Sequence, residues 1–326
     1  MKYKIAVITP KNKNDYMTDT VIDGLIALRT ENPDLKFYFP KTYPSDFGES
    51  KICLSDADFI SFANSADLIL FCWGKDNTDY EKANKINRFD KTAFIDGSEV
   101  GGDRRYDSKI QEELISGTYK DRGAIDLEME NKCALYFRRE KPYLRNIIPL
   151  PFGIERSYTK YYSKDTKKDI DFFCVFGYDE YAPLRRQARE VLVDFCKKND
   201  LTYFVDKTDN DNFYKMLSRS KVGISIGGGG FDTARFWEIL GNNCILLTEK
   251  IDIYQENSNR LKYDRIFQFV DLEQFCSQLE KIGQFLKNSY DQKNMSVEYE
   301  KIFSEHSSKS RVLEIIQKAE EKGIIE

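Results

Sequence analysis

Four consecutive glycines and the helical segment after them form the part of this sequence best suited to chemistry. The stretch 222–248 reads VGISIGGGGFDTARFWEILGNNCILLT: a buried strand, glycines 227–230, a helix from Thr233 to Leu240, a Gly-Asn-Asn turn and a second strand. Consecutive glycines let the backbone approach a ligand closely. The start of a helix presents unpaired N–H groups and the positive end of the helix dipole, which together bind phosphate groups. The segment therefore predicts an anion site.

Two charged residues on that helix narrow the kind of anion. Arg235 and Glu238 are three positions apart and so lie on one helix face. A guanidinium group pairs well with a diphosphate, and a carboxylate accepts hydrogen bonds from vicinal ribose hydroxyls. The combination predicts a site for a nucleoside diphosphate. The simpler alternative is a surface ion pair beside a loose glycine loop.

Other nucleotide and catalytic motifs do not fit the sequence. The spacing G-x-G-x-x-G is broken because Ala234 and Arg235 occupy its later positions, and the loop 9–12 after the first predicted strand holds no glycine. The absence of glycine from the loop 9–12 counts against an NAD enzyme with its cofactor on the N-terminal half. Neither a Walker sequence nor a G-x-S-x-G elbow occurs. The D-x-D triplets at 56–58, 169–171 and 209–211 are scattered, and we interpret them as chance. We therefore expect no metal and no cofactor.

Composition limits the class of protein. The chain has 326 residues, of which 41% are hydrophobic and 32% charged, enough for two domains with real cores. Its 50 Lys and Arg against 54 Asp and Glu give no basic footprint for nucleic acid. The seven cysteines form no C-x-x-C pair, which favours free thiols in a reducing, cytoplasmic compartment. No apolar run approaches the roughly 20 residues of a membrane helix, so we expect no transmembrane segment.

The order of predicted elements indicates two successive α/β units. Apolar strands alternate with amphipathic helices up to about residue 137, and the pattern restarts near Asp169 after the Pro- and Gly-containing segment 146–153. Such alternation predicts doubly wound parallel sheets. We expect two Rossmann-like domains, 1–150 and 151–303, and a C-terminal helix, 304–326, that returns toward the first domain.

The second half also resembles a known family, the CgeB-like glycosyltransferases of the GT-B group. The matching segments are Pro149 to Gly153, Asp169 to Gly177 with Tyr181 and Arg185-Arg186, Phe231 to Glu238 with Gly241 and 244–247, and Glu305-His306 with Arg311. In the first half, Ile95 to Glu99 and Leu135 to Glu140 are also similar to relatives.

This resemblance implies a GT-B fold, in which two domains face each other across a cleft. It implies donor binding by the C-terminal domain, an acceptor site on the N-terminal domain, and no obligatory metal. The resulting donor-site prediction comprises Gly177, Arg185 or Arg186, Gly227, Gly228, Gly229, Gly230, Thr233 and Arg235 for the diphosphate, and Glu238 for the ribose.

The catalytic base is predicted by elimination. His306 is the only histidine, so a base on the N-terminal half must be a carboxylate. Asp96, Glu99 and Asp103 follow the predicted strand 92–95, where a parallel sheet presents its ligand-binding loops. Asp96 is slightly preferred because it stands at the strand end. A retaining enzyme would instead use the donor's own phosphate as base, and then neither carboxylate would be essential. The simpler alternative is that these acids belong to a solvated loop.

Three further residues are predicted on the acceptor side or between the domains: Arg138, Arg139 and His306. The alternatives are a surface ion-pair cluster for the arginines and a structural histidine. The function favoured by the sequence is transfer of a sugar from a nucleoside-diphosphate sugar to a hydroxyl of a glycan or cell-surface component. The alternatives are a non-catalytic glycan- or nucleotide-binding protein of the same shape, and an NAD-dependent oxidoreductase with its cofactor on the second unit.

Overall fold

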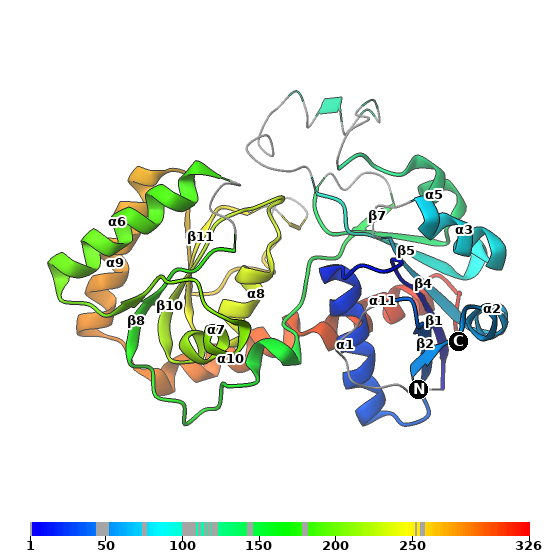
Figure 1. The fold of residues 1–326 in the computed structure, drawn as a ribbon, viewed down its shortest axis with the longest axis horizontal. Coiled ribbons are helices and arrows are strands. Elements are labelled where there is room, and N and C mark those ends of the chain that lie inside the picture. The colour runs from blue at the N-terminus through cyan, green and yellow to red at the C-terminus, as the bar shows by residue number, and fades with distance from the viewer. Residues whose placement is uncertain are drawn as a thin grey trace.

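The chain folds around two parallel β-sheets, which lie in separate lobes (Figure 1). The computed structural model describes residues 2–43, 52–73, 77–99, 109, 112–113, 116, 118, 123–141, 146–177, 182–251, 253–254 and 258–326. The first sheet has seven strands in the order β3-β2-β1-β4-β5-β6-β7, and the second has five in the order β12-β11-β10-β8-β9. All described strand pairs are parallel, as predicted from the alternating pattern.

The first sheet is built from the N-terminal half of the chain. Most of its parallel strands are connected by helices. The strands are apolar because side chains such as Ile5, Leu70 and Phe94 are buried in the core. The elements are β1 Lys4–Ile8, α1 Tyr16–Glu31, β2 Lys36–Pro40, β3 Cys53–Leu54, α2 Asp56–Asn64, β4 Leu68–Trp73, α3 Asn77–Ile86, β5 Thr92–Asp96, α5 Leu127–Lys132, β6 Leu135–Arg138 and β7 Ile147–Pro149.

The second sheet is built from the C-terminal half. Sequence patterns missed β3 and β7 of the first sheet and β12 of the second, because short strands beside loops leave little periodicity. The elements are β8 Ile170–Phe173, α6 Pro183–Asn199, β9 Tyr203–Phe204, α7 Asn210–Ser218, β10 Ser220–Ser225, α8 Ala234–Gly241, β11 Ile245–Glu249, β12 Ile266–Phe269, α9 Leu272–Asn288, α10 Gln292–His306 and α11 Ser308–Glu321.

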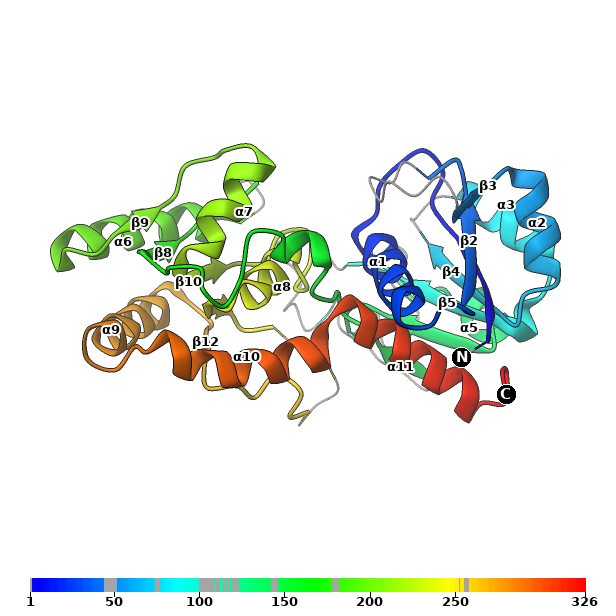
Figure 2. The ribbon, with the colours of Figure 1, turned by 90° about the horizontal axis from the view of Figure 1, so that it is seen from below.

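The last helix leaves the second lobe and lies beside α1 of the first, as Figure 2 shows. Gly24 in α1 permits this approach, because a Cβ there would lie 2.3 Å from the Ser308 carbonyl oxygen and 2.7 Å from a Val312 methyl. Ile154 N donates to His306 O at 2.8 Å, and Ser308 N donates to Ile154 O at 2.9 Å. The chain therefore passes between the lobes twice, at 150–155 and at 306–308. The domain limits 1–150, 151–303 and 304–326 remain a prediction.

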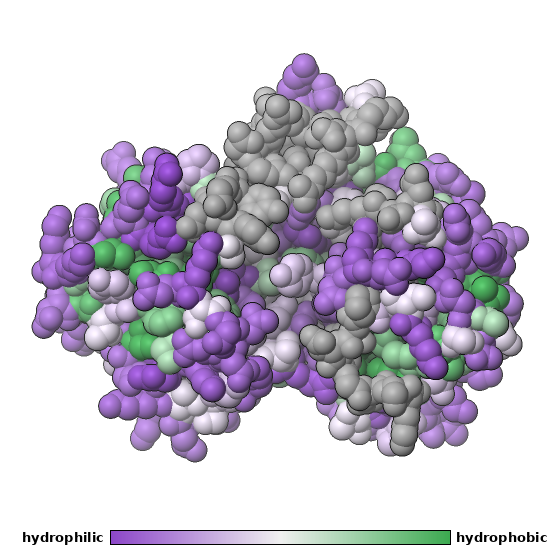
Figure 3. Space-filling view, in the orientation of Figure 1, coloured by the Kyte–Doolittle hydropathy of each residue, from purple (hydrophilic) through white to green (hydrophobic). Residues whose placement is uncertain are grey.

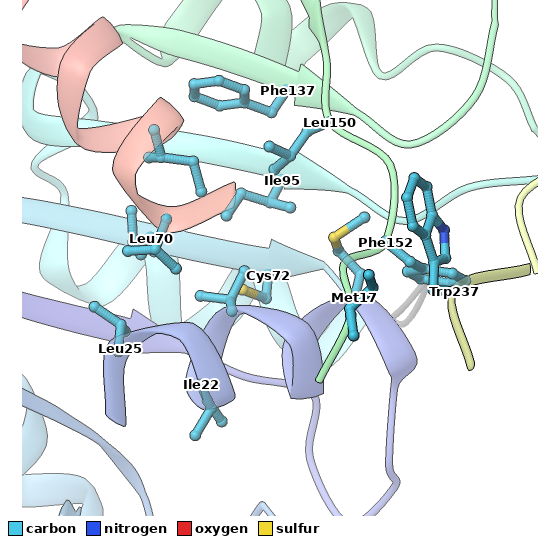
Figure 4. Close-up of a cluster of buried hydrophobic side chains, with 14 of the residues drawn as sticks. Met17, Ile22, Leu25, Leu70, Cys72, Ile95, Phe137, Leu150, Phe152 and Trp237 are labelled. Carbon is cyan, nitrogen blue, oxygen red and sulfur yellow. The ribbon is translucent and has the colours of Figure 1, made fainter. Parts of the chain in front are cut away.

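One apolar core extends through this junction. Met17, Leu70 and Phe137 of the first lobe belong to the same cluster as Trp237 of α8. Figure 4 shows Phe152, in the segment between the sheets, next to Trp237. Contiguous apolar burial of this kind fixes the relation of the lobes more strongly than surface ion pairs would.

Hydrophilic side chains dominate the face shown in Figure 3. Among the described residues, no helix has both the length and the apolar character needed to span a bilayer.

Candidate functional site

A cavity of about 390 Å³ lies where the two lobes meet, at the carboxyl ends of strands β5, β8 and β10. This is the edge at which parallel sheets bind ligands. The first lobe contributes the start of α1 and the residues after β5 and β6, and the second lobe contributes the glycine loop and α8. The lining residues are Asn14, Asp15, Tyr16, Glu99, Arg139, Phe152, Phe176, Gly177, Arg185, Gly228, Gly229, Gly230, Asp232, Thr233, Ala234, Arg235 and Glu238.

The glycine loop and the start of α8 present backbone donors to this cavity. Thr233 is the N-cap of α8, and its hydroxyl accepts a hydrogen bond from Phe236 N. No described residue accepts a hydrogen bond from the amides of Gly229 and Gly230. These N–H groups and the α8 dipole can bind an anion. The predicted strand–glycine–helix arrangement is therefore present, with Thr233 as the cap of the helix.

Charged side chains from both lobes pack directly on the loop, which explains why it consists of glycines. A Cβ on Gly228 would lie 2.7 Å from an Arg185 nitrogen. On Gly229 it would lie 2.7 Å from Oε1 of Glu99, and on Gly230 it would lie 2.3 Å from Oε1 of Glu140. Side chains at these three positions would displace one cation and two carboxylates.

Arg139 connects the first lobe to the start of α8. Its guanidinium donates to Oε2 of Glu99 at 2.9 Å, to Oε1 of Glu140 at 3.1 Å and to the Asp232 carbonyl at 2.9 Å. The group also stacks 4.4 Å above the Phe152 ring. The prediction of an inter-domain position for Arg139 agrees with this geometry, although its role in binding an acceptor is untested.

Asp232 is a buried carboxylate that the sequence interpretation did not assign to the site. It accepts hydrogen bonds from Phe152 N and from Nε1 of Trp237, both at 2.7 Å. Its own amide donates to Glu140 at 2.8 Å. Burial raises the pKa of Asp232 to about 6, against the opposing effect of Arg139. The signals for it in the sequence were its position just before the helix and its inclusion in the family-like segment Phe231 to Glu238.

Arg235 and Glu238 form the predicted pair on one face of α8. Nη1 of Arg235 lies 2.5 Å from Oε2 of Glu238, and the guanidinium stacks 4.0 Å above Phe213. The hydroxyl of Tyr214 donates to Oε1 of Glu238 at 2.8 Å. Nε of Arg235 is buried without a partner among the described residues. Both side chains line the cavity, so they are not an ordinary surface ion pair.

Asp96 and Arg138, both predicted for the site, do not line the cavity, and this placement favours Glu99 over Asp96 as the candidate base. Asp96 ends β5 and is completely buried, where its carboxylate is bound by Arg138, by the Tyr136 hydroxyl at 2.6 Å and by Ser98 N at 2.8 Å. Arg138 is also completely buried, and its Nε donates to Glu140 O at 2.8 Å. The strand directs these two side chains into the first lobe, whereas Glu99, three residues further on, reaches the cavity.

The single histidine is part of the core. Nε2 of His306 lies 2.9 Å from both the Tyr263 hydroxyl and the Arg260 carbonyl, and Nδ1 lies 3.0 Å from Arg311. Burial and two neighbouring arginines lower the pKa of His306 to about 2, so the ring stays neutral. These surroundings, at the junction of α10 and α11, agree with the alternative that His306 has a structural role.

The remaining predicted residues fall in different places. Gly177 and Arg185 line the cavity, and Arg185 donates to the Ile226 carbonyl at 2.9 Å. Arg186 is exposed on the neighbouring face of α6. Asp103 and Tyr181 lie outside the described residues. Asn14, Asp15, Tyr16 and Phe152 line the cavity but were not predicted, because helix-start and linker residues carry no motif of their own.

The D-x-D triplets have structural partners. Asp169 pairs with Arg219, Asp171 pairs with Lys221, and Asp209 caps α7. The described residues contain no group of three or more His, Cys, Asp or Glu side chains arranged to hold a metal ion.

Two larger hollows lie away from the glycine loop. One, of about 1040 Å³, adjoins the starting ends of β6 and β7, and its charged residues include the ion pair of Arg260 with Glu314. The other, of about 640 Å³, surrounds residues near both chain ends. Ligands of parallel sheets bind at the opposite, carboxyl ends of the strands, which favours the smaller inter-lobe cavity as the site.

Known proteins resemble this chain in fold. No protein-family model and no curated protein matches the sequence, so the CgeB-like resemblance is not confirmed. An alpha-glucosyltransferase in complex with UDP and a 13-mer DNA aligns at a TM-score of 0.58 and 10% identity, over 98% of this chain and 100% of that one. HepE of Anabaena, in complex with UDP and glucose, aligns at 0.54 and 10% identity, over 98% and 100%. A glycosyltransferase from Rickettsia africae aligns at 0.55 and 10% identity, over 98% of each chain. The predicted fold class is thereby confirmed: two Rossmann-like parallel sheets in the GT-B arrangement.

Proposed function

We propose that this protein transfers a sugar from a nucleoside-diphosphate sugar to a hydroxyl group of a glycan or cell-surface acceptor. The observation that carries the proposal is the inter-lobe cavity in which glycine-loop amides, the start of α8 and Arg185 converge. Structures of similar fold that contain UDP or UDP-glucose support a nucleotide-sugar donor. The near balance of basic and acidic residues argues for a glycan over a nucleic-acid acceptor.

The donor would bind mainly to the second lobe. Gly228 to Gly230, the amides at Thr233 and the guanidinium of Arg185 would hold the diphosphate. Glu238 would accept hydrogen bonds from the ribose, and Arg235, on the same face of α8, would also bind the diphosphate. Gly177 leaves open space at the edge of the cavity, since a Cβ there would contact nothing within 4 Å.

The reaction would depend mostly on stabilising the departing diphosphate. The bond from the anomeric carbon to the phosphate oxygen breaks, the acceptor oxygen bonds to that carbon, and the acceptor proton goes to a base. Glu99 replaces Asp96 as the proposed base, because it lines the cavity from the first lobe. We propose that no metal is required, since the helix start and arginines carry the positive charge.

A thermal-shift panel of nucleosides, nucleoside diphosphates and their sugars tests the proposal. A ligand at 100 times its dissociation constant stabilises the folded protein by about 2.7 kcal/mol. We expect one base series to bind, with the diphosphate binding more tightly than the nucleoside. Slow hydrolysis of the matching sugar nucleotide would distinguish an enzyme from a non-catalytic binding protein. Binding to none of the panel would contradict the proposal.

A further inference from the structure

Glu99 occupies the space over the glycine loop that a bound diphosphate would need. Its Oε1 atom lies 2.7 Å from the position of a Cβ on Gly229, so the carboxylate rests directly against that backbone. Gly229 is the middle of the three glycines of the loop that line the cavity. The neighbouring Gly228 is covered by the Arg185 guanidinium, a group that attracts phosphate.

A carboxylate and a diphosphate cannot share this position. Two anions in van der Waals contact repel each other, most strongly where little water separates them. The side chain of Glu99 is only 13% exposed, so solvent screens its charge weakly. Binding of a diphosphate to the loop therefore requires Glu99 to move away from Gly229.

Arg139 determines what happens to Glu99 when it moves. The Arg139 guanidinium is fixed by the Asp232 carbonyl at 2.9 Å, by Glu140 at 3.1 Å and by stacking on Phe152. Glu99 is bound to the same guanidinium at 2.9 Å. A carboxylate displaced from the loop remains tethered to Arg139 and stays in the cavity, on the first-lobe side.

We infer that Glu99 is a competitive gate on the donor site: the donor diphosphate displaces its carboxylate from Gly229, and only then can the carboxylate serve an acceptor hydroxyl. The inference rests on the proposed function and adds an order of binding to it, donor before acceptor. It also assigns Glu99 two opposite effects, because the residue that assists transfer weakens donor binding.

The test compares the affinities of UDP and uridine, measured by calorimetry, for wild type and variants. Glu99→Gln removes the charge and should tighten UDP binding by roughly 5- to 10-fold, the effect of one like-charge contact at about 4 Å. Uridine, which has no phosphate, should bind both proteins equally. Glu128→Gln, an exposed acid in the same lobe, makes the same charge change and should leave UDP affinity unchanged. The same titrations with GDP, ADP and dTDP test the gate in case the donor nucleotide carries a base other than uracil.

A second variant separates charge from shape. Glu99→Asp keeps the charge on a side chain one methylene shorter, and it should bind UDP within about twofold of wild type. The gate would be overturned if Glu99→Gln left UDP affinity unchanged or weakened it. It would also be overturned if Glu99→Asp tightened UDP binding as much as Glu99→Gln does. Either result would leave the proposed function standing. Failure of every variant and of wild type to bind any nucleoside diphosphate would overturn both.

Discussion

The hydroxyl of Tyr214 on α7 donates a 2.8 Å hydrogen bond to Oε1 of Glu238 on α8. Burial and the Glu238 charge raise the pKa of Tyr214, so the phenol keeps its proton. Tyr214 is itself stacked on Tyr158, with ring centroids 6.1 Å apart. Since Arg235 binds the other oxygen of Glu238, the carboxylate is held from both sides at the wall of the cavity.

Replacement of Tyr214 by Phe tests this positioning role. The variant keeps the stacked ring and removes one hydrogen bond to a charged group, so affinity for nucleoside and nucleoside diphosphate should fall alike, by about 1–2 kcal/mol. Calorimetric titration with uridine and UDP measures both. Tyr161→Phe removes a hydroxyl that is exposed and bonded to Asp211, outside the cavity, and serves as the control. Wild-type affinities in Tyr214→Phe would show that Glu238 does not need this partner.

Replacement of Arg235 by Ala should weaken nucleoside-diphosphate binding by roughly 1.5–3 kcal/mol, the value of a hydrogen bond to a charged group. The nucleoside should lose less, because its proposed partner is Glu238. Glu238→Gln should instead weaken both ligands alike. Wild-type affinities in both variants would place the nucleotide elsewhere in the molecule.

Replacement of Gly230 by Ala should destabilise the fold by about 1–3 kcal/mol. The new Cβ would lie 2.3 Å from Oε1 of Glu140, and that oxygen already accepts from Asp232 N and Arg139. Gly177→Ala is the matched control, since its Cβ would meet nothing within 4 Å and should change stability by less than about 0.5 kcal/mol. Denaturant unfolding measures the stability of both variants. Similar free energies of unfolding for the two would indicate that the glycine loop moves to make room for the Cβ on residue 230.

Replacement of Asp96 by Asn should destabilise the protein by about 3–5 kcal/mol, because it leaves Arg138 buried without its charged partner. Glu99→Gln should cost less than about 1 kcal/mol, since Glu99 lies at the cavity wall. Urea unfolding of the two variants side by side separates a core role from a site role. A normally stable Asp96→Asn protein would contradict our interpretation of this pair.

The pH dependence of stability should reflect Glu155, which lies between the lobes. Burial, together with the charges of Asp23 and Asp19, raises its pKa to about 8 from an ordinary 4.5. An unfolded chain releases this proton near pH 4.5 and the folded chain retains it to about pH 8. Unfolding therefore releases a proton between these values, and stability falls as pH rises.

Glu155→Gln should remove that slope and stabilise the protein at pH 7 by on the order of 1–3 kcal/mol. Chemical unfolding at intervals from pH 5 to pH 8.5 measures the effect, and the exposed variant Glu128→Gln should keep the wild-type slope. If the free energy of unfolding varied with pH in the same way in wild type and Glu155→Gln, another group would control the pH dependence.

The sequence by itself determined the elements around the glycine loop. Local spacing is sufficient for this: four glycines after an apolar strand, then a helix from about Thr233 with Arg235 and Glu238 on one face. The strand–helix alternation also determined that two parallel sheets would form, because parallel strands need crossover helices and are apolar on both faces.

Only the tertiary structure decided which residues of the first lobe meet that loop. Asp96 and Glu99 are three positions apart after the same strand, and local pattern gives no reason to separate them. The direction in which each side chain leaves the sheet separates them: Asp96 turns into the lobe toward Arg138, and Glu99 reaches Gly229 across the lobe boundary. The partners of Asp232, Glu140 and Arg139 depend in the same way on contacts between residues about 90 positions apart, such as the 92-residue separation of Asp232 and Glu140, which no local periodicity encodes.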